Sequence, residues 1–464
     1  MADIRLTNVS GINLKQNPLN TDGDLLRVVN CDPTHIGAWK KRPGFITYLG
    51  TPDNAEVTCQ FNFTLNNGTQ FWNYRISGGS VYYSTQGTGA WTICGNGTLT
   101  NGAFTSPGFL ENTMILGDGT AVTRHTTNGT SFTDTTSAPR AQFFTDFQNR
   151  IWAGGTASSE FYSTTGTPSD WTSDSSSISI PGPGRINQTF KSNDRLVVPK
   201  NSGVILRYDG NNLIDIATNL GPSSPQSLAN VEDFSFYLNR SGVFGFGGAK
   251  PEIVSNKIEL LVYNDAGSAI VGTAFDNAPG VAHRYDYLLS VGSVADDLTN
   301  EPINNAVLSY DFRLNDWRTY SLATRPTAWL SYADNLGSQQ LAFGDINGQC
   351  YQMAGTAVTD NGTAIQAVLE GFIHGGSFLE KKWNWGRFLF NPGCEANVQV
   401  ALTDTFTKEN KVWQSLGQAK DGVVEYHFPS DSRGRFLFYK ISDNSSAARF
   451  EWYGAELDVD LINR

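Results

Sequence analysis

Cysteine and histidine are scarce in this chain, with five of each among 464 residues. The cysteines, at positions 31, 59, 94, 350 and 394, are odd in number and widely spaced, with no C-x-x-C pair. This spacing suggests neither a disulfide framework nor a zinc site, and no histidine stands in H-E-x-x-H or another ligand spacing. We therefore expect buried thiols, no metal and no cofactor.

Long hydrophobic runs are also missing. No stretch reaches the roughly 18 apolar residues of a membrane span. Residues 1–6 lack the basic and apolar regions of a secretory signal peptide. The sequence thus predicts a soluble protein with no membrane insertion.

The motifs of catalysis and of phosphate binding are absent. No G-x-S-x-G elbow accompanies a strand-to-helix switch, and the glycines at 154–155 and 242–248 lack the lysine and helix start of a phosphate loop. The carboxylate pairs at 232–233 and 296–297 predict polar loops rather than glycosidase dyads, because adjacent strand residues point to opposite faces. We expect no enzyme activity.

A possible calcium loop at 345–348 has the sequence Asp-Ile-Asn-Gly but lacks the downstream ligand of an EF-hand. It predicts a hairpin turn between Phe343 and Tyr351 instead.

Glycine and aromatic residues are plentiful. The chain has 47 glycines and 12% aromatic residues but only 17% charged residues. This composition is typical of an all-β chain with many tight turns.

One degenerate pattern recurs seven times between residues 55 and 365. Each copy has a polar turn, a short apolar run, a Gly- or Ser-rich hairpin and often a closing aromatic residue. A period of about 40 residues with several short strands per unit is typical of a β-propeller blade. We therefore expect a propeller of about seven blades over 55–365. The segments that contain these apolar runs begin at Phe71, Met114, Ile151, Leu196, Phe236, Tyr287 and Gln340.

The closing aromatics, such as Trp91, Trp171 and Trp317, are expected to pack between neighbouring blades. The segment from Ser163 to Trp171 is similar to a sialidase Asp box, but Thr165 stands where the aspartate belongs. We interpret it as a structural blade turn.

Residues 1–54 are predicted to form an N-terminal arm. It ends in a strong turn at 43–44, which follows Trp39, Lys40, Lys41 and Arg42. This basic run could be a solvated turn, or it could contact nucleic acid or an acidic partner.

A segment at 251–282 interrupts the propeller and is interpreted as an insertion. Its Ser255, followed by Ile258, Leu261 and Val262, predicts an N-capped amphipathic turn or short helix. Such insertions usually serve contacts, so Lys257 and Glu259 are further candidate contact residues.

Residues 366–464 are predicted to form a β-sandwich. Short strands follow one another at intervals of about 10 to 15 residues, as expected for such a fold. Val398, Val400 and Leu402 alternate with polar residues, which is typical of strands with one buried face.

The formal net charge of -11 is concentrated in the predicted propeller. Residues 55–365 carry 16 basic and 26 acidic side chains, against 6 and 5 in residues 1–54 and 11 and 13 in residues 366–464. An acidic surface disfavours tight static binding of nucleic acid. It suits a surface along which DNA slides without sticking.

An Asn- and Pro-rich arm, a propeller and a sandwich in this order resemble the tail nozzle proteins of short-tailed bacteriophages, also called packaged-DNA stabilisation or head-to-tail connector proteins. The resemblance covers most of the chain, and its order and total length carry more weight than any single motif. The segments that carry it are 11–45, 255–258 and 435–445.

The resemblance implies a structural virion protein of the phage tail, made in the host cytoplasm. Six copies would form a ring below the portal and adaptor, contact the adaptor and other tail proteins, retain packaged double-stranded DNA and conduct it during ejection. Two alternatives remain: a carbohydrate-binding or glycan-cleaving propeller at a tail tip, and a minor capsid or baseplate component.

Overall fold

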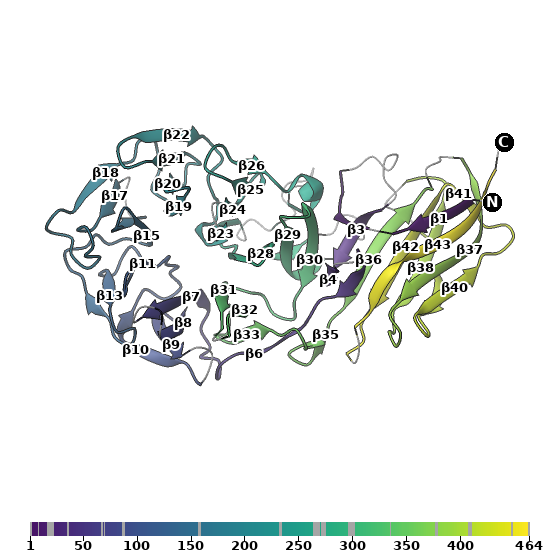
Figure 1. Cartoon of the computed structure of the whole chain (residues 1–464), viewed down its shortest axis with the longest axis horizontal. Helices are drawn as coiled ribbons and strands as arrows, with labels where there is room; N and C mark the ends of the chain where they lie inside the picture. Colours follow the sequence, from purple (N-terminus) through teal and green to yellow (C-terminus); the bar gives the residue numbers. More distant parts are fainter. Residues whose placement is uncertain are drawn as a thin grey trace.

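The computed structural model is an all-β chain, with helical structure confined to short segments such as η1 (Pro225–Ser227), η2 (Asn256–Ile258) and α1 (Glu259–Val262) (Figure 1). No helix among the described residues is long and apolar enough to cross a membrane. The structure describes residues 2–7, 9–15, 23–34, 37–65, 68, 70–85, 89–155, 159–231, 234–262, 270, 275–295, 302–334, 336–375, 379–406, 411–446 and 449–462.

Six blades of antiparallel strands form a propeller arrangement (Figure 1). The first blade consists of β7 (Val57–Leu65), β8 (Gln70–Ser77), β9 (Ser80–Thr85) and β10 (Thr92–Thr98). The second consists of β11 (Gly108–Leu110), β12 (Thr113–Leu116), β13 (Arg124–Thr126) and β14 (Thr133–Asp134). The third consists of β15 (Phe143–Phe147), β16 (Arg150–Gly154), β17 (Ser159–Tyr162) and β18 (Ser176–Ser179). The fourth consists of β19 (Phe190–Ser192), β20 (Arg195–Pro199), β21 (Ile205–Tyr208) and β22 (Leu213–Ala217). The fifth consists of β23 (Ala229–Val231), β24 (Phe234–Asn239), β25 (Gly242–Phe246) and β26 (Glu252–Ile253). The sixth is β31 (Ala328–Ala333), β32 (Gln339–Gly344), β33 (Cys350–Met353) and β6 (Phe45–Thr47). The prediction of an all-β chain with a propeller is confirmed, with six blades.

Four further antiparallel strands lie between the fifth and sixth blades (Figure 1). Their sheet continues beyond the propeller through β3 (Asp24–Val29), which pairs with the last of the four on one side and with β36 (Ala367–Ile373) on the other. One ten-stranded sheet therefore connects the propeller to the C-terminal region. The four strands are β27 (Gly280–His283), β28 (Asp286–Val294), β29 (Ile303–Asp311) and β30 (Asp316–Ser321).

The N-terminal segment is built into the sheets and is not a separate arm. β1 (Ala2–Leu6) and β5 (Trp39–Lys41) pair with β43 (Glu451–Leu461) near the end of the chain. β4 (Cys31–Pro33) pairs with β5, β2 (Ser10–Ile12) runs parallel to β3, and β6 closes the sixth blade. The expected arm is corrected in this respect, because its backbone hydrogen bonds are made with three different sheets.

The C-terminal region contains two sheets that share one hydrophobic core. The ten-stranded sheet continues through β36, β42 (Phe436–Asp443), β38 (Asn397–Thr403) and β39 (Gln414–Gln418). The other sheet has seven strands, among them β37 (Lys381–Phe390), β40 (Val423–His427) and β41 (Arg433–Gly434). Tyr439 of the first sheet packs against Trp452 and Phe388 of the second, at ring centroid distances of 5.5 and 6.2 Å.

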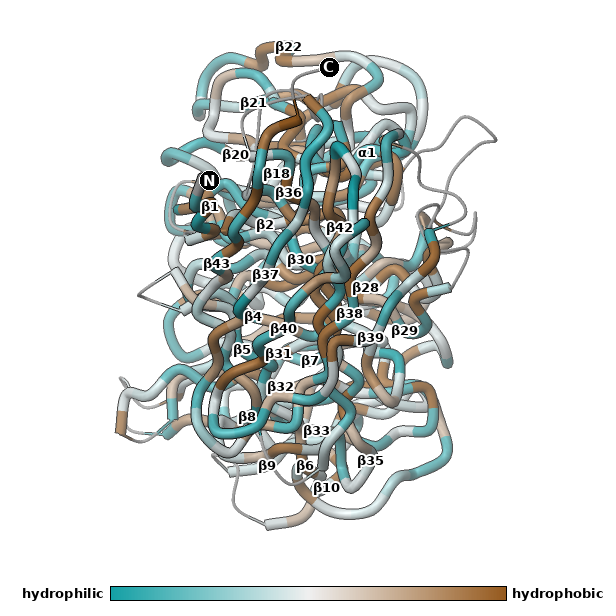
Figure 2. The backbone as a smooth tube through the Cα atoms, turned by 90° about the vertical axis from the view of Figure 1, so that its right-hand side faces the viewer, coloured by the Kyte–Doolittle hydropathy of each residue, from teal (hydrophilic) through white to brown (hydrophobic). Residues whose placement is uncertain are grey.

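Along the strands of this region, short hydrophobic stretches are interspersed with hydrophilic ones (Figure 2). In β38 the side chains of Val398 and Val400 are buried, whereas Asn397 is exposed. The predicted alternation is therefore confirmed at Val398 and Val400 but not beyond them, because Ala401 is buried on the opposite face and Leu402 is only half-buried.

The closing aromatic of the third blade packs as predicted. Trp171 is buried in a cluster with Ile115 of the second blade and Ile151 of the third. Its indole N–H donates to the carbonyl of Pro168 at 3.0 Å, which fixes the turn. Trp171 thus contributes to the contact between two neighbouring blades.

The turn at 345–348 is the hairpin predicted from the sequence. It connects β32 and β33, and the Asp345 carboxylate accepts hydrogen bonds from the amides of Asn347 and Gln349, both at 2.9 Å. The aspartate therefore stabilises the turn as an acceptor for backbone amides.

The predicted insertion at 251–282 is partly corrected. Its first residues form β26 of the fifth blade, and η2 and α1 follow, with Ile258, Leu261 and Val262 buried in the large core. Ser255 does not cap the helix; its hydroxyl accepts a hydrogen bond from the Val243 amide at 3.0 Å. Residues 263–269 and 271–274 lie outside the described residues.

Closure of the sixth blade by β6 yields a stability prediction. Phe45 is 1% exposed and packs against Phe343 and Tyr351 at ring centroid distances of 5.1 and 5.0 Å. Phe45→Ala should lower the free energy of unfolding by about 3 to 5 kcal/mol, because it leaves a cavity between strands far apart in sequence. Chemical denaturation measures this change.

The neighbouring Ile46 offers a matched control, because its side chain is 48% exposed. Ile46→Ala should change the free energy of unfolding by less than about 1 kcal/mol. Equal losses in the two variants would contradict the role of Phe45 in closing the blade.

Candidate functional site

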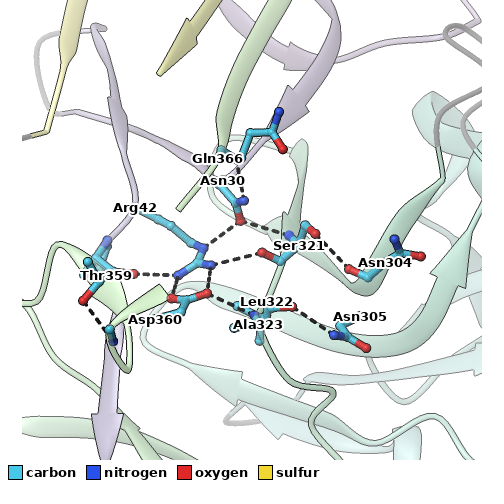
Figure 3. A network of polar contacts seen from close by, with 12 residues as sticks. Asn30, Arg42, Asn304, Asn305, Ser321, Leu322, Ala323, Thr359, Asp360 and Gln366 are labelled. Carbon is cyan, nitrogen blue, oxygen red and sulfur yellow. Dashed lines mark hydrogen bonds and ion pairs between the residues drawn. The ribbon is translucent and has the colours of Figure 1, made fainter. Parts of the chain in front are cut away.

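The first candidate site is a buried junction centred on Arg42, which is 1% exposed. Its guanidinium donates two hydrogen bonds to the Asp360 carboxylate, at 2.8 and 2.7 Å, and a third to the side-chain oxygen of Asn30 at 2.8 Å (Figure 3). The planar fork of arginine matches a carboxylate in this way. Burial of the cation is thus compensated by a paired anion and a polar acceptor.

The junction joins segments that are distant in sequence. Arg42 also donates to the carbonyl of Ser321 at 3.2 Å, and Asn30 accepts from the Ser321 amide at 2.9 Å. The Asn30 amide group donates to the carbonyl of Gln366 at 2.7 Å (Figure 3). The N-terminal segment, the end of β30, β34 (Thr359–Asp360) and the chain before β36 are therefore held at one point.

A second buried cation lies nearby. Arg318 contacts Asp32 at 3.1 Å and Asp286 at 2.8 Å, and Tyr320 donates to Asp32 at 2.6 Å. Burial raises the pKa of Asp286 to about 6, although the Arg318 charge opposes this rise. This network ties β4 of the N-terminal segment to β28 and β30.

The basic run at 39–42 is mostly internal, which corrects the expectation of a solvated turn. Lys41 is fully buried and pairs with Asp443 at 2.8 Å. Trp39 is 1% exposed and donates its indole N–H to the carbonyl of Val9 at 2.9 Å. The side chains of Trp39, Lys41 and Arg42 contact other residues of the same chain, because the strand pairing of β5 turns this segment inward.

The other predicted contact residues lie nearer the surface. Lys40 is exposed on β5. Lys257 pairs with Asp316 at 3.0 Å, and Glu259 pairs with Lys15; all four side chains keep part of their surface accessible. Lys40, Lys257 and Glu259 therefore stay predictions as partner contacts, on two different parts of the fold.

The second candidate site, which we call the mouth cavity, is a hollow of about 660 Å³ at one end of the propeller. The segments that lead into the inner strands of the second to fifth blades line it, and so does the segment before β27. Concave sites with several convergent polar groups are the usual binding sites of folded proteins. Its lining includes Phe104, Gln142, Arg185, Asn187, Asn239 and Asp276.

Amide side chains brace the wall of the mouth cavity. Asn187 donates to the carbonyl of Pro222 at 2.7 Å, and Asn239 donates to the carbonyl of Gly221 at 2.6 Å. Gln142 donates to the carbonyl of Phe104 at 2.8 Å, across two blades. These bonds connect the loops that line the cavity to one another.

A buried carboxyl group, Glu160, lies between the third and fourth blades. Burial raises its pKa to about 8, although the hydroxyl of Thr189 donates a hydrogen bond to it and opposes the rise. A side chain at Gly154 would collide with this carboxyl group, whose Oε1 lies 2.6 Å from the position of an added Cβ. Sequence reasoning missed Glu160, because nothing in the local pattern marks it as buried.

The cysteine, histidine and carboxylate side chains are dispersed over the described residues. Within the part of the chain that the structure describes, no group of three or more His, Cys, Asp or Glu side chains could hold a metal ion. All five cysteines are buried and unpaired, as the sequence predicted. The carboxylate pairs at 232–233 and 296–297 lie outside the described residues.

Comparison with known proteins gives no family. No protein-family model matches the chain, and no curated protein matches it. Similar solved structures include the computationally designed Ika8 protein, YCF48 bound to D1 peptide, and the WD40 β-propeller domain of Doa1. Each is 10% identical; they cover 67%, 66% and 67% of this chain and 99%, 95% and 97% of their own, with TM-scores of 0.40, 0.41 and 0.41.

The junction yields a stability prediction. Arg42→Ala should lower the free energy of unfolding by about 3 to 5 kcal/mol, because it leaves the Asp360 carboxylate buried without its partner. Arg387→Ala removes an exposed pair with Glu425 and should cost less than about 1 kcal/mol. Chemical denaturation compares the two variants, and equal losses would contradict the energetic role of the junction.

The buried carboxyl group yields a pH prediction. In the folded chain its pKa is about 8, against an ordinary value of 4.5, so the protonated form stabilises the fold. This stabilisation is complete below about pH 4.5 and is lost as the pH rises toward 8. Glu160→Gln has no carboxyl group to ionise, so it should not lose this stability as the pH rises. The free energy of unfolding of the variant, relative to that of the wild type, should therefore increase from pH 5 to pH 8. A difference in the free energy of unfolding between Glu160→Gln and wild type that stays constant from pH 5 to pH 8 would refute this.

Proposed function

We propose that this chain is a structural protein of a bacteriophage tail, a nozzle or tail hub that forms a ring below the portal and adaptor. The observation that carries the proposal is the ten-stranded sheet that extends from the propeller, through β3, into the C-terminal region. With the resemblance of the sequence to tail nozzle proteins, this continuity favours a rigid wall element over a propeller on a flexible linker.

Rigidity is the property that such a wall requires. A ring that retains packaged DNA must resist the force of the packaged genome without separation of its parts. The junction at Arg42, the Lys41–Asp443 pair and the Arg318 network each connect the N-terminal segment to a different part of the chain. Internal domain motion is thereby opposed at several points.

Two finer features belong to this proposal. We count β27–β30 as a seventh blade, because their strand order repeats that of the six blades and β27 lies between β23 and β31. We interpret the two sheets of the C-terminal region as a β-sandwich, because their inner faces share a core. The arrangement then agrees with the domain order of the resemblance.

The charge distribution supports passage of DNA. The predicted propeller region has ten more acidic than basic side chains. A wall of this sign repels the phosphate backbone and avoids contacts that would retard a moving duplex. In the assembled ring, we expect acidic side chains to outnumber basic ones on the surface that faces the axis.

Electron microscopy of the purified protein tests the assembly. Class averages should show rings with a central channel, and we expect six copies per ring. Isolated single chains at all concentrations, or a ring with a basic lumen, would contradict the nozzle. Deletion of residues 1–45 is not a selective test, because it removes β1 to β5 and Phe45 from the folded sheets.

A charge reversal gives the selective test. Lys40 is exposed beside buried Lys41 and lies opposite Asp32 and Glu451 on the neighbouring strands, so Lys40→Glu should cost the fold no more than about 2 kcal/mol. If Lys40 contacts an acidic partner subunit, the reversal should weaken ring formation at least several-fold, measured by analytical ultracentrifugation. The exposed Lys420→Glu is the control. Equal effects of the two reversals would remove Lys40 from the interface.

A further inference from the structure

The mouth cavity has a polar wall that the nozzle function does not use. Half-buried or exposed amide and hydroxyl side chains face it, including Ser202, Asn219, Gln226, Ser241 and Asn277. Each amide group offers two donors and an acceptor, which can pair with vicinal hydroxyl groups. This chemistry suits a polyhydroxylated ligand better than an apolar one.

An apolar surface accompanies these polar groups. Phe104 is partly exposed and packs beside Phe143, at a ring centroid distance of 6.5 Å. Phe104 and Gln226 also line a smaller cavity of about 170 Å³ along the inner strands. The lining of the mouth cavity thus combines an apolar ring with polar groups, as ligand sites commonly do.

The charges of the mouth cavity favour one anionic group. Arg240 and Asp276 pair with each other at 3.2 Å, so their charges offset. Arg185 is exposed, and its side chain makes no ion pair with any residue that the structure describes. Its backbone is fixed, because its amide donates to the side-chain oxygen of Asn201 at 3.1 Å. A guanidinium in this state can form a bidentate contact with a carboxylate.

Preorganisation strengthens the case for a ligand. The amides of Gln142, Asn187 and Asn239 connect the loops to one another through backbone carbonyls. A wall that is already ordered loses little conformational entropy when a ligand binds. The volume of about 660 Å³ lies in the range of small-ligand sites.

We propose that the mouth cavity binds an acidic oligosaccharide. Arg185 contacts a sugar carboxylate, the amides of Asn219, Gln226 and Asn277 pair with hydroxyl groups, and Phe104 lies against an apolar face of a sugar ring. The proposal does not depend on ring assembly, so it stands or fails separately from the nozzle function.

Isothermal titration of the full chain tests this site with three probes: trigalacturonic acid, neutral maltotriose and a short oligothymidylate. We expect trigalacturonic acid to bind and maltotriose to bind at least tenfold more weakly. Arg185→Gln should weaken the binding of trigalacturonic acid at least tenfold and leave the binding of maltotriose unchanged, because the glutamine side chain can still form hydrogen bonds but carries no charge.

The control variant is Arg195→Gln, in the same blade. Arg195 is exposed at the start of β20 and does not line the mouth cavity. The Arg195→Gln variant should bind every probe as tightly as the wild type does. Absence of trigalacturonic acid binding, equal losses in the two variants, or tighter binding of the oligothymidylate than of the sugar would each overturn the proposal.

Discussion

The buried contact of Arg42 with Asp360 and Asn30 constrains the rest of the structure. A guanidinium without water needs an anion and acceptors in fixed directions, because an unpaired buried charge is very costly. These acceptors come from the N-terminal segment, from β34 and from the end of β30. All of these hydrogen bonds form only when the three segments lie in fixed positions around the guanidinium. The contact therefore fixes where the N-terminal segment lies relative to β34 and to the end of β30.

The position of the N-terminal segment follows from this constraint. Its strands supply an edge of the sixth blade, the bridge between β30 and β36, and partners for β43. Such pairings join residues from opposite ends of the chain, so the fold is completed only after the C-terminal strands are present. High contact order of this kind is typical of slowly folding β proteins.

The two proposals rely on different parts of this fold. A nozzle wall depends on the continuous sheet and on the buried ion pairs, which keep the propeller and the C-terminal region in a fixed relation. Ligand binding at the mouth cavity depends on the loops between blades, and loops tolerate substitutions that leave the strands beneath them intact. A structural ring that also contacts a glycan is therefore physically consistent, because neither role alters the residues of the other.

The sequence by itself determined the local elements. Strand alternation, the period of about 40 residues and turn residues predicted the blades, the packing of Trp171 and the turn at Asp345, because each depends on neighbours in sequence. Burial of Lys41, Arg42 and Glu160 was decided by the tertiary structure alone. Arg42 and Asp360 are 318 positions apart, and no local pattern indicates whether a charged side chain meets a distant partner or water. The mouth cavity likewise exists only where loops from several blades converge.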